Sequence, residues 1–378
     1  MHRRRFLAAG AAAASVGLAG CRSLFQTRSA RSPPLVEDRP DAVYVPSHSE
    51  GMAMVDTADA GDYRVALTYA RPHRFWLVNG DRTNKVEVGG ADSLHLMTTV
   101  WDPETGVVIP SGAITATITS GGESLASGKT LWPMLSQNMG VHAGDNLQLD
   151  GDGTYDVEVA VGPLSARRTG AFRDRFGERG TASFTLEFEQ SAFDDLPFER
   201  LPDRQGDRGA LDPMDMEMLP VSEAPAVSDL PGTVVGEETS GDAVFAVTRL
   251  DSPSAGVTDS ESGDDESTET AVDGDGSDDD DNGDRSYLAV SLRTPHNRYP
   301  VPMAALSATV TRDGRTVFEG ALPSTVDPEL GYHYGALADV RSGDEVTVSV
   351  DTPPQVARHE GYETAFFEFS DVSLTVDE

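Results

Sequence analysis

Short runs of apolar and β-branched residues recur along the chain, and turns rich in glycine, aspartate and asparagine separate them. In the segment Tyr155–Val161, the residues Tyr155, Val157, Val159 and Val161 occupy every second position. This alternation is typical of a strand that buries one face, and such runs return at a spacing of roughly ten residues. The sequence contains no convincing long amphipathic helix, so it predicts an all-β protein.

Composition divides the chain into two strand-rich blocks. Residues 48–190 and residues 231–378 carry the strand pattern, and the Pro- and acid-rich segment 191–230 indicates a linker between them. Short strands and frequent turns in blocks of this length predict a β-sandwich in each. Within the second block, residues 251–285 are rich in Ser, Gly and Asp, and we predict a disordered acidic loop there.

The second block repeats the first in the same order along the chain. Gly61–Thr68 aligns with Gly241–Thr248, and Gly140–Gly144 aligns with Gly331–Gly335. Matches that keep one order over whole domains predict a tandem duplication. The alignment also places the acidic loop between the first two strands of the second domain, where a long loop adds little closure cost.

The N-terminus has the layout of an export signal. The cationic start Arg3–Leu7 resembles a twin-arginine signal, and the apolar run Ala8–Ala19 is short for a membrane span. Leu18–Cys21 resembles a lipobox, which predicts a signal peptide over residues 1–20 and lipidation of Cys21. An uncleaved anchor helix with an incidental cysteine is the alternative.

The segment after the signal peptide, residues 21–47, begins with a stretch rich in Ser, Arg and Pro, and we predict a tether. We therefore expect a lipoprotein anchored on the outer face of a cytoplasmic membrane. Cys21 is the only cysteine, so the mature chain is expected to contain no internal disulfide and no thiolate metal site.

The charge of the chain indicates the salt environment of the protein and excludes one class of partner. The formal net charge is −34, and Lys85 and Lys129 are the only lysines. Strong acidity with few lysines indicates a halophilic protein, because concentrated salt shortens the Debye length to roughly 3 Å and screens the repulsion. An acidic surface also argues against a nucleic-acid partner, whose phosphates require a basic face.

Several motifs in the first block carry a family resemblance. They are His95-Leu96-Met97, Trp101–Gly106, Trp132-Pro133-Met134, Met139–Asn146 and Gly151–Tyr155. Together they resemble the P19-type periplasmic iron-transport proteins over about residues 51–188. The resemblance implies an immunoglobulin-like sandwich, often dimeric, that binds copper and serves ferrous iron uptake beside a permease. If the repeat shares this fold, the chain contains two tandem immunoglobulin-like domains.

The same resemblance implies a metal site built from histidine and methionine. By motif, His95 and His142 would be histidine ligands and Met134 the thioether ligand. The chain departs from the family at Met97, where the family has a glutamate, and at Arg168, where it has a histidine. A thioether in place of a carboxylate favours a cuprous over a ferrous ion.

A second group of ligand-type residues lies at the start of the first block. Glu50 and Met52, with His48 and Met54, could complete the coordination if that segment packs across the sandwich. We therefore predict a site for copper or iron that includes the six residues His95, Met134, His142, Met97, Glu50 and Met52.

The second block resembles a module found downstream of P19-type domains in haloarchaeal proteins, for which no function is implied. It keeps His333 opposite His142 and has His359 opposite Arg168. It lacks the other ligands, because Tyr287 replaces His95 and Thr325 replaces Met134, so we expect no independent metal site. One hypothesis is that the two repeats pair as a family dimer would, with one competent and one degraded site; a homodimer is the other possibility.

Structural roles are open for the same residues. His95 could be a buried core histidine and Met134 core filler. His73 is followed by Phe75 and Trp76, which indicate a packed edge rather than a site. The linker methionines in Met214–Met218 could contact copper or iron transiently, although a tether is the simpler interpretation. No nucleophile elbow, phosphate loop or dinucleotide fingerprint appears, so we expect no enzyme.

The sequence thus predicts a lipid-anchored protein that captures iron or copper for uptake beside a permease. The alternative is a surface scaffold or adhesion module whose histidines are structural. Because imidazole binds metal only when it is unprotonated, affinity is expected to fall as the pH drops through about 6.5.

Overall fold

The computed structural model describes residues 33–110, 113–252, 256–257 and 285–377. The predicted signal peptide, Cys21, residues 21–32 of the predicted tether and nearly all of the acidic loop lie outside these residues. The chain divides into two compact units, Met1–Leu35 and Val36–Glu378. All strands and helical turns of the described residues lie in the second unit.

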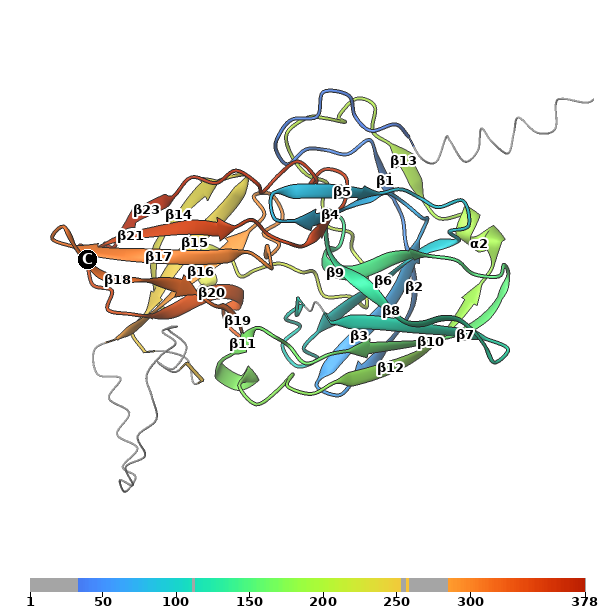
Figure 1. Cartoon of the computed structure of the whole chain (residues 1–378), viewed down its shortest axis with the longest axis horizontal. Helices are drawn as coiled ribbons and strands as arrows, with labels where there is room; N and C mark the ends of the chain where they lie inside the picture. The colour runs from blue at the N-terminus through green and yellow to red at the C-terminus, as the bar shows by residue number, and fades with distance from the viewer. Residues whose placement is uncertain (1–32, 111–112, 253–255, 258–284, 378) are drawn as a thin grey trace, which may run out of the picture. The chain divides into compact units, whose positions relative to one another are not determined.

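The all-β prediction is confirmed: strands dominate the described residues, and helical structure is limited to short turns. Residues 48–190, the first half, contain strands β1 to β12 (Figure 1). Their bounds are His48–Glu50, Ala53–Ala60, Tyr63–Ala70, Phe75–Asn79, Arg82–Val86, Leu94–Trp101, Ile114–Ser120, Glu123–Ser136, Gly140–Leu147, Gly153–Val161, Arg167–Arg168 and Gly180–Phe188. The 3-10 turn η1 spans Gly170–Phe172. No helix in the described parts of the chain is long and apolar enough to cross a membrane.

The linker and the second half continue the pattern. The linker contains the helical turn α2 (Gln190–Asp194), strand β13 (Phe198–Arg200) and the 3-10 turn η2 (Val227–Asp229). The second half, residues 231–377, contains β14 to β23. Their bounds are Thr233–Ser240, Ala243–Leu250, Ser286–Arg293, Ala305–Arg312, Arg315–Leu322, Ser324–Asp327, Gly331–Ala338, Glu345–Thr352, Ala357–Arg358 and Val372–Thr375.

The first half has two layers that share strand β8. The order β2-β3-β6-β9 continues through β8 into β7-β10-β12. Residues of β8 up to Leu131 pair with β7, and residues from Trp132 onward pair with β9. In β12 every second side chain is buried, as expected of a strand with one face on a core. Side chains of both layers, such as Leu96 and Phe184, belong to one apolar cluster.

The second half uses the same strand order in two separate sheets. One sheet runs β14-β15-β16-β20-β19 and the other β18-β17-β21-β23. The crossing made by the continuous β8 is here divided between β18, which ends at Leu322, and β19, which begins at Ser324. Pro323 separates them, and a proline has no N–H to donate to a strand ladder.

Each half contributes a two-residue strand to a sheet of the other half. Strand β11 lies parallel to β19, with Arg168 opposite Val326. Strand β22 lies parallel to β8, with Ala357 opposite Met134 and Arg358 opposite Leu135. The exchange is reciprocal, so residues from both halves approach each other at two equivalent places.

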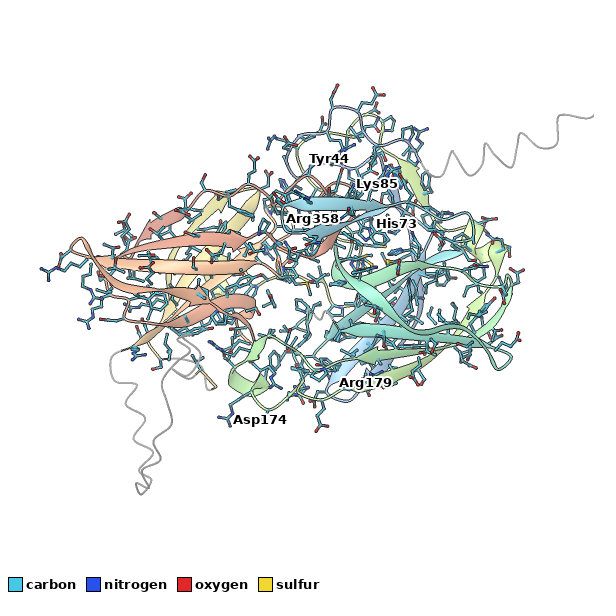
Figure 2. The ribbon with its side chains drawn as sticks, viewed as in Figure 1. Tyr44, His73, Lys85, Asp174, Arg179 and Arg358 are labelled. Carbon is cyan, nitrogen blue, oxygen red and sulfur yellow. The ribbon has the colours of Figure 1, made fainter. Side chains whose placement is uncertain are left out.

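The N-terminal part of this unit differs from the predicted tether over residues 21–47. Ala42, Val43, Tyr44 and Val45 are buried, and Tyr44 (Figure 2) donates a hydrogen bond from its hydroxyl to the buried Glu363. The apolar character of these four residues explains the difference, because burial removes their surface from water.

The predicted linker over residues 191–230 is likewise structured in part. Strand β13 pairs with β1, so that Glu50 lies opposite Phe198. Leu201 N–H also donates to the carbonyl of Ser47 over 3.0 Å. The Pro- and acid-rich composition indicated an interdomain connection, but these pairings hold its beginning against the segment that supplies Glu50.

Gly180 lies where β12 approaches β2, and substituting it tests how tightly the two layers of the first half pack there. A Cβ added to Gly180 of β12 would lie 2.0 Å from the carbonyl oxygen of Ala60 in β2. Backbone cannot yield easily, so Gly180→Ala is expected to reduce the free energy of unfolding by about 1–3 kcal/mol or more. Denaturant midpoints in high salt measure the change. Gly90→Ala is the matched control because a Cβ at Gly90 meets no atom within 4 Å, and equal midpoints for both variants would contradict the prediction.

Candidate metal centre

His95 occupies a fully buried position on the central strand β6. Its Nδ1 lies 2.9 Å from the side-chain oxygen of Asn146, the residue opposite it on β9. An amide oxygen only accepts, so Nδ1 carries the proton and Nε2 has a lone pair. That Nε2 is buried and has no hydrogen-bond partner. A Cβ at Gly144 would lie 2.8 Å from it, so the glycine keeps the approach open.

Two further histidines have the same orientation. His73, in the connection between β3 and β4, holds its Nδ1 2.9 Å from the carbonyl of Arg71. His142 of β9 holds its Nδ1 3.0 Å from the carbonyl of Gly140. Both Nε2 atoms are buried without a hydrogen-bond partner. Hydrogen bonds at Nδ1 therefore fix one tautomer in all three histidines. Each Nε2 keeps a lone pair that can bind a metal cation.

The fourth histidine comes from the second half. His359 directly follows β22, and its backbone N–H donates to the carbonyl of Leu135 in β8. This places its Nε2 3.3 Å from the sulfur of Met134. Met134 itself is fully buried opposite His142 and packs with Phe75.

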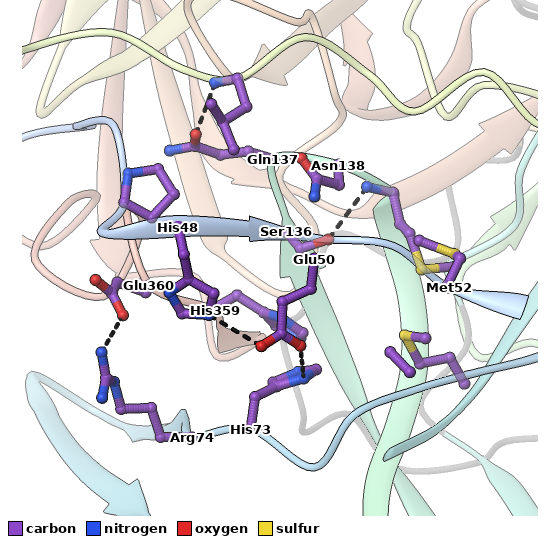
Figure 3. A pocket seen from close by; sticks show the side chains of 15 residues that line it. His48, Glu50, Met52, His73, Arg74, Ser136, Gln137, Asn138, His359 and Glu360 are labelled. Atoms are coloured by element: carbon purple, nitrogen blue, oxygen red, sulfur yellow. Dashed lines mark hydrogen bonds and ion pairs between the residues drawn. The ribbon is translucent and has the colours of Figure 1, made fainter. Parts of the chain in front are cut away.

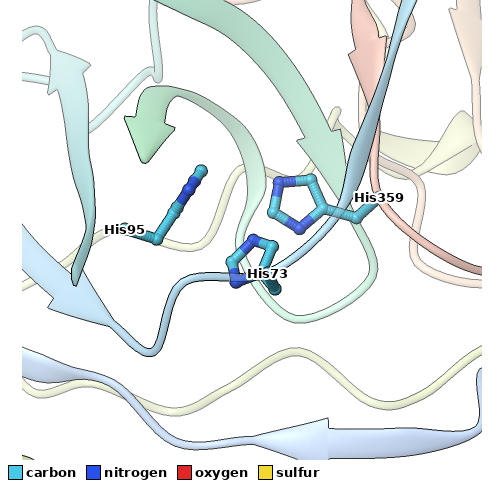
Figure 4. A group of neighbouring side chains, drawn as sticks. All are labelled: His73, His95 and His359. Carbon is cyan, nitrogen blue, oxygen red and sulfur yellow. The ribbon is translucent and has the colours of Figure 1, made fainter. Parts of the chain in front are cut away.

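The four imidazoles form a compact group. One ring nitrogen from each of His73, His95 and His359 lies within 4.8 Å of the others (Figure 4). The rings of His73 and His95 are 4.1 Å apart and those of His73 and His359 are 4.7 Å apart. His142 lies 5.1 Å from His359 between ring centroids. Imidazoles gathered in this way fit a metal ion, because within the described residues the Nε2 atoms of His73, His95 and His142 have no hydrogen-bond partner.

A cavity of about 100 Å³ adjoins the histidines and is lined by the other predicted ligands. Figure 3 shows Glu50 beside His73, and Met52 and Met97 also line the cavity. Glu50 Oε1 lies 3.1 Å from His48 Nε2, and Glu50 Oε2 lies 3.9 Å from His73 Nδ1. Glu50 of β1 therefore supplies a carboxylate, whereas Met97 of β6 supplies a thioether where the family motif has a glutamate.

The structure thus brings all six sequence-predicted residues to one region. His95, His142 and Met134 surround His359, whereas Glu50, Met52 and Met97 line the adjoining cavity.

Burial keeps these imidazoles neutral. It lowers the pKa of His95 and of His359 well below the usual 6.5, and the nearby His73 adds to the effect in both. Burial lowers the pKa of His142 to about 4. For His73, burial lowers the pKa while Glu50 acts against the change. A neutral imidazole is the form that binds a metal.

The equivalent place in the second half is closed. His333 holds its Nδ1 3.0 Å from the carbonyl of Gly331, as His142 does with Gly140. Its Nε2, however, lies 3.0 Å from the hydroxyl of Tyr287, which also lies 3.4 Å from Thr325. The histidine lone pair is therefore used inside the protein, and the replaced ligands form a hydrogen-bonded group instead.

The strand register corrects one detail of the repeat alignment, which placed His359 opposite Arg168. Thr169 N–H donates to Val326 as His359 N–H donates to Leu135, so the histidine corresponds to Thr169. Arg168 instead corresponds to Arg358, since each donates from its guanidinium to the carbonyl seven residues later. The Arg168 guanidinium thus donates from Nη1 to the carbonyl of Arg175 in its own loop.

Sequence patterns did not identify His73 or His359 as ligands. His73 lies in a connection and is brought to the site by Asn146, whose side-chain NH2 donates to the His73 carbonyl over 2.9 Å. His359 was noted only as a difference between the repeats. The signal that could have identified it is a histidine present in one repeat and absent from the other.

Comparison with known families assigns both halves. Residues 90–196 match the family model described as Fe2+ transport protein, and residues 251–375 match a domain of unknown function, DUF7350. Residues 90–196 are an Fe2+ transport protein domain. The resemblance stated from the motifs is thereby confirmed, and His95, Met134 and His142 fall within the matched segment, whereas His73 and His359 lie outside it.

Solved structures were also compared. FetP of uropathogenic E. coli is 18% identical, covers 38% of this chain and 96% of its own, and has a TM-score of 0.27. Copper-reconstituted P19 of Campylobacter jejuni is 14% identical, covers 36% of this chain and 96% of its own, and has a TM-score of 0.29. A comparison with curated proteins finds no match.

The buried histidines of the Fe2+ transport domain make the metal-free fold sensitive to acid. Their folded pKa values lie below 6.5, so the unfolded chain binds more protons as the pH falls below that value. The free energy of unfolding is highest above about pH 6.5 and declines toward pH 4. At pH 4 the burial of His142 alone would have lowered it by on the order of 3 kcal/mol. Denaturant titrations with a chelator at a series of pH values measure this slope. His142→Asn is expected to flatten it, and an unchanged slope would contradict the assignment.

Proposed function

We propose that this protein captures a soft or borderline metal ion, copper or iron, as cargo for uptake. The observation that carries the proposal is the set of three buried Nε2 lone pairs, on His73, His95 and His142, that have no hydrogen-bond partner. A merely structural histidine would be satisfied at both nitrogens, as His333 is in the second half. The match to the Fe2+ transport family supports the same function.

The donor set favours particular ions. Neutral imidazoles with the thioether of Met134 suit a cuprous ion, because soft sulfur ligands select Cu(I). The cost of burying an ion also grows with the square of its charge, which favours a monovalent ion among neutral ligands. A divalent ion, ferrous or cupric, requires compensation, and Glu50 is the carboxylate placed to supply it from the adjoining cavity.

The setting belongs to the same proposal. A lipid anchor at Cys21 and twin-arginine export would hold the protein outside the cytoplasmic membrane, where an iron permease would receive the ion. The N-terminal motifs of the sequence support the anchor, and the acidity of the chain supports a halophilic environment. An immunoglobulin-like arrangement of each half is supported by the strand order that both halves share.

Removing His359, the ligand that the second half supplies, tests the proposal. His359→Ala is expected to weaken Cu(I) binding at least roughly 100-fold. Losing a residue that only orients a ligand already costs up to about that factor, and here the ligand itself is lost. Anaerobic competition with a chromophoric chelator in high salt measures the affinity. Fe(II), Cu(II) and Zn(II) titrated in parallel identify the preferred ion.

His333→Ala is the matched control, since it removes the equivalent histidine whose Nε2 is already hydrogen-bonded to Tyr287. It should leave the affinity unchanged. Wild-type protein that binds none of the four ions would refute the proposal and favour a surface scaffold or adhesion module. Equal affinity in the wild type and His359→Ala would remove His359 from the site.

A further inference from the structure

The linker between the halves presents an alternating series of thioethers and carboxylates. Met214 and Met216 are partly buried, whereas Asp215 and Glu217 are exposed and Met218 is 50% exposed. Two methionines therefore face the protein while the carboxylates between and after them face solvent. Acidic side chains at such a position attract cations to the surface.

Hydrogen bonds fix this part of the linker beside the metal centre. Met214 N–H donates to the carbonyl of Asn138 over 2.8 Å, in the turn that precedes β9. Leu211 N–H donates to the side-chain oxygen of Gln137 over 2.8 Å, and its carbonyl accepts from Asn297 over 2.9 Å. The position of Met214 is thus set by contacts with both halves.

Three methionines line one small cavity at this place. The space has a volume of about 20 Å³, sufficient for one water-sized species, and is lined by Met139, Met214, Met216, Thr99, Asn138, Leu219, Pro220 and Val221. Thr99 is 3% exposed and its hydroxyl has no hydrogen-bond partner. A buried unpaired hydroxyl is unfavourable, so a polar or ionic occupant would suit this cavity better than further apolar packing.

The small cavity shares a wall with the cavity of the metal centre. Asn138 and Met139 line both. His95, Met97 and Thr99 occupy alternate positions of β6 and so project to one face, with roughly 13 Å of strand from the first to the last. Met97 lines the larger cavity and Thr99 the smaller one. Ligand-type groups therefore follow one another from the linker to the histidines.

We propose that Met139, Met214 and Met216 form a second, thioether site for Cu(I), through which the ion enters the histidine site. Three neutral thioethers select a soft monovalent ion and reject ferrous and zinc ions. Binding at the methionines stands on its own geometry, whereas the transfer rests on the proposed function of the histidines. No electron is exchanged in the step, because the ion only changes ligands.

The test uses the full chain with 13C-methyl methionine, anaerobic, in concentrated sodium sulfate because chloride competes for Cu(I). The wild type is expected to bind two equivalents of Cu(I). The double variant Met214→Leu/Met216→Leu should bind one and load it more slowly, and Met218→Leu, exposed in the same segment, should behave as the wild type. The double variant His95→Ala/His359→Ala should also retain one equivalent, with sulfur-only coordination by X-ray absorption.

The outcomes separate the two sites. Methyl resonances of Met139, Met214 and Met216 should shift in the histidine double variant. If they stay fixed and that variant binds no Cu(I), the methionines are core filler and the inference is overturned while the histidine site stands. If the histidine variant instead binds as much Cu(I) as the wild type, the proposed function of the histidines fails and only the methionine site remains.

Discussion

The parallel pairing of β22 with β8 is the contact on which the metal centre depends. Two register positions, Ala357 with Met134 and Arg358 with Leu135, set where the following residue enters the first half. His359 then meets Met134, His95 and His142. Arg358, fully buried, donates to the carbonyls of Pro354 and Ala365 and so holds the turn that presents the histidine. Without this pairing the first half would supply three histidines and lack the fourth.

The two halves show how one architecture can keep a site or close it. In the first half, Nδ1 hydrogen bonds orient the imidazoles, and Gly144 leaves the Nε2 of His95 accessible. In the second half, the same Nδ1 bond orients His333, but the hydroxyl of Tyr287 takes its Nε2. The difference is local, since the strand order and the reciprocal strand exchange are common to both.

The sequence predicted the class of the fold and much of the centre, and the reasons are specific. Alternation within strands such as Tyr155–Val161 is a local property, so the all-β class followed from it. His95, Met134 and His142 lie within motifs that resemble a known family. His73 escaped because its place depends on Asn146, which is distant along the chain. The role of His359 depends on a two-residue strand, and an alignment that is wrong by one position hides such a register.

The linker gives the site a further property. Because residues 191–230 join the halves in one chain, β22 meets β8 as an intramolecular event, at an effective concentration set by the connection. A site assembled from two separate chains would come apart on dilution, as mass action requires. Here the fraction of complete sites is independent of the protein concentration, and each single chain holds a complete site.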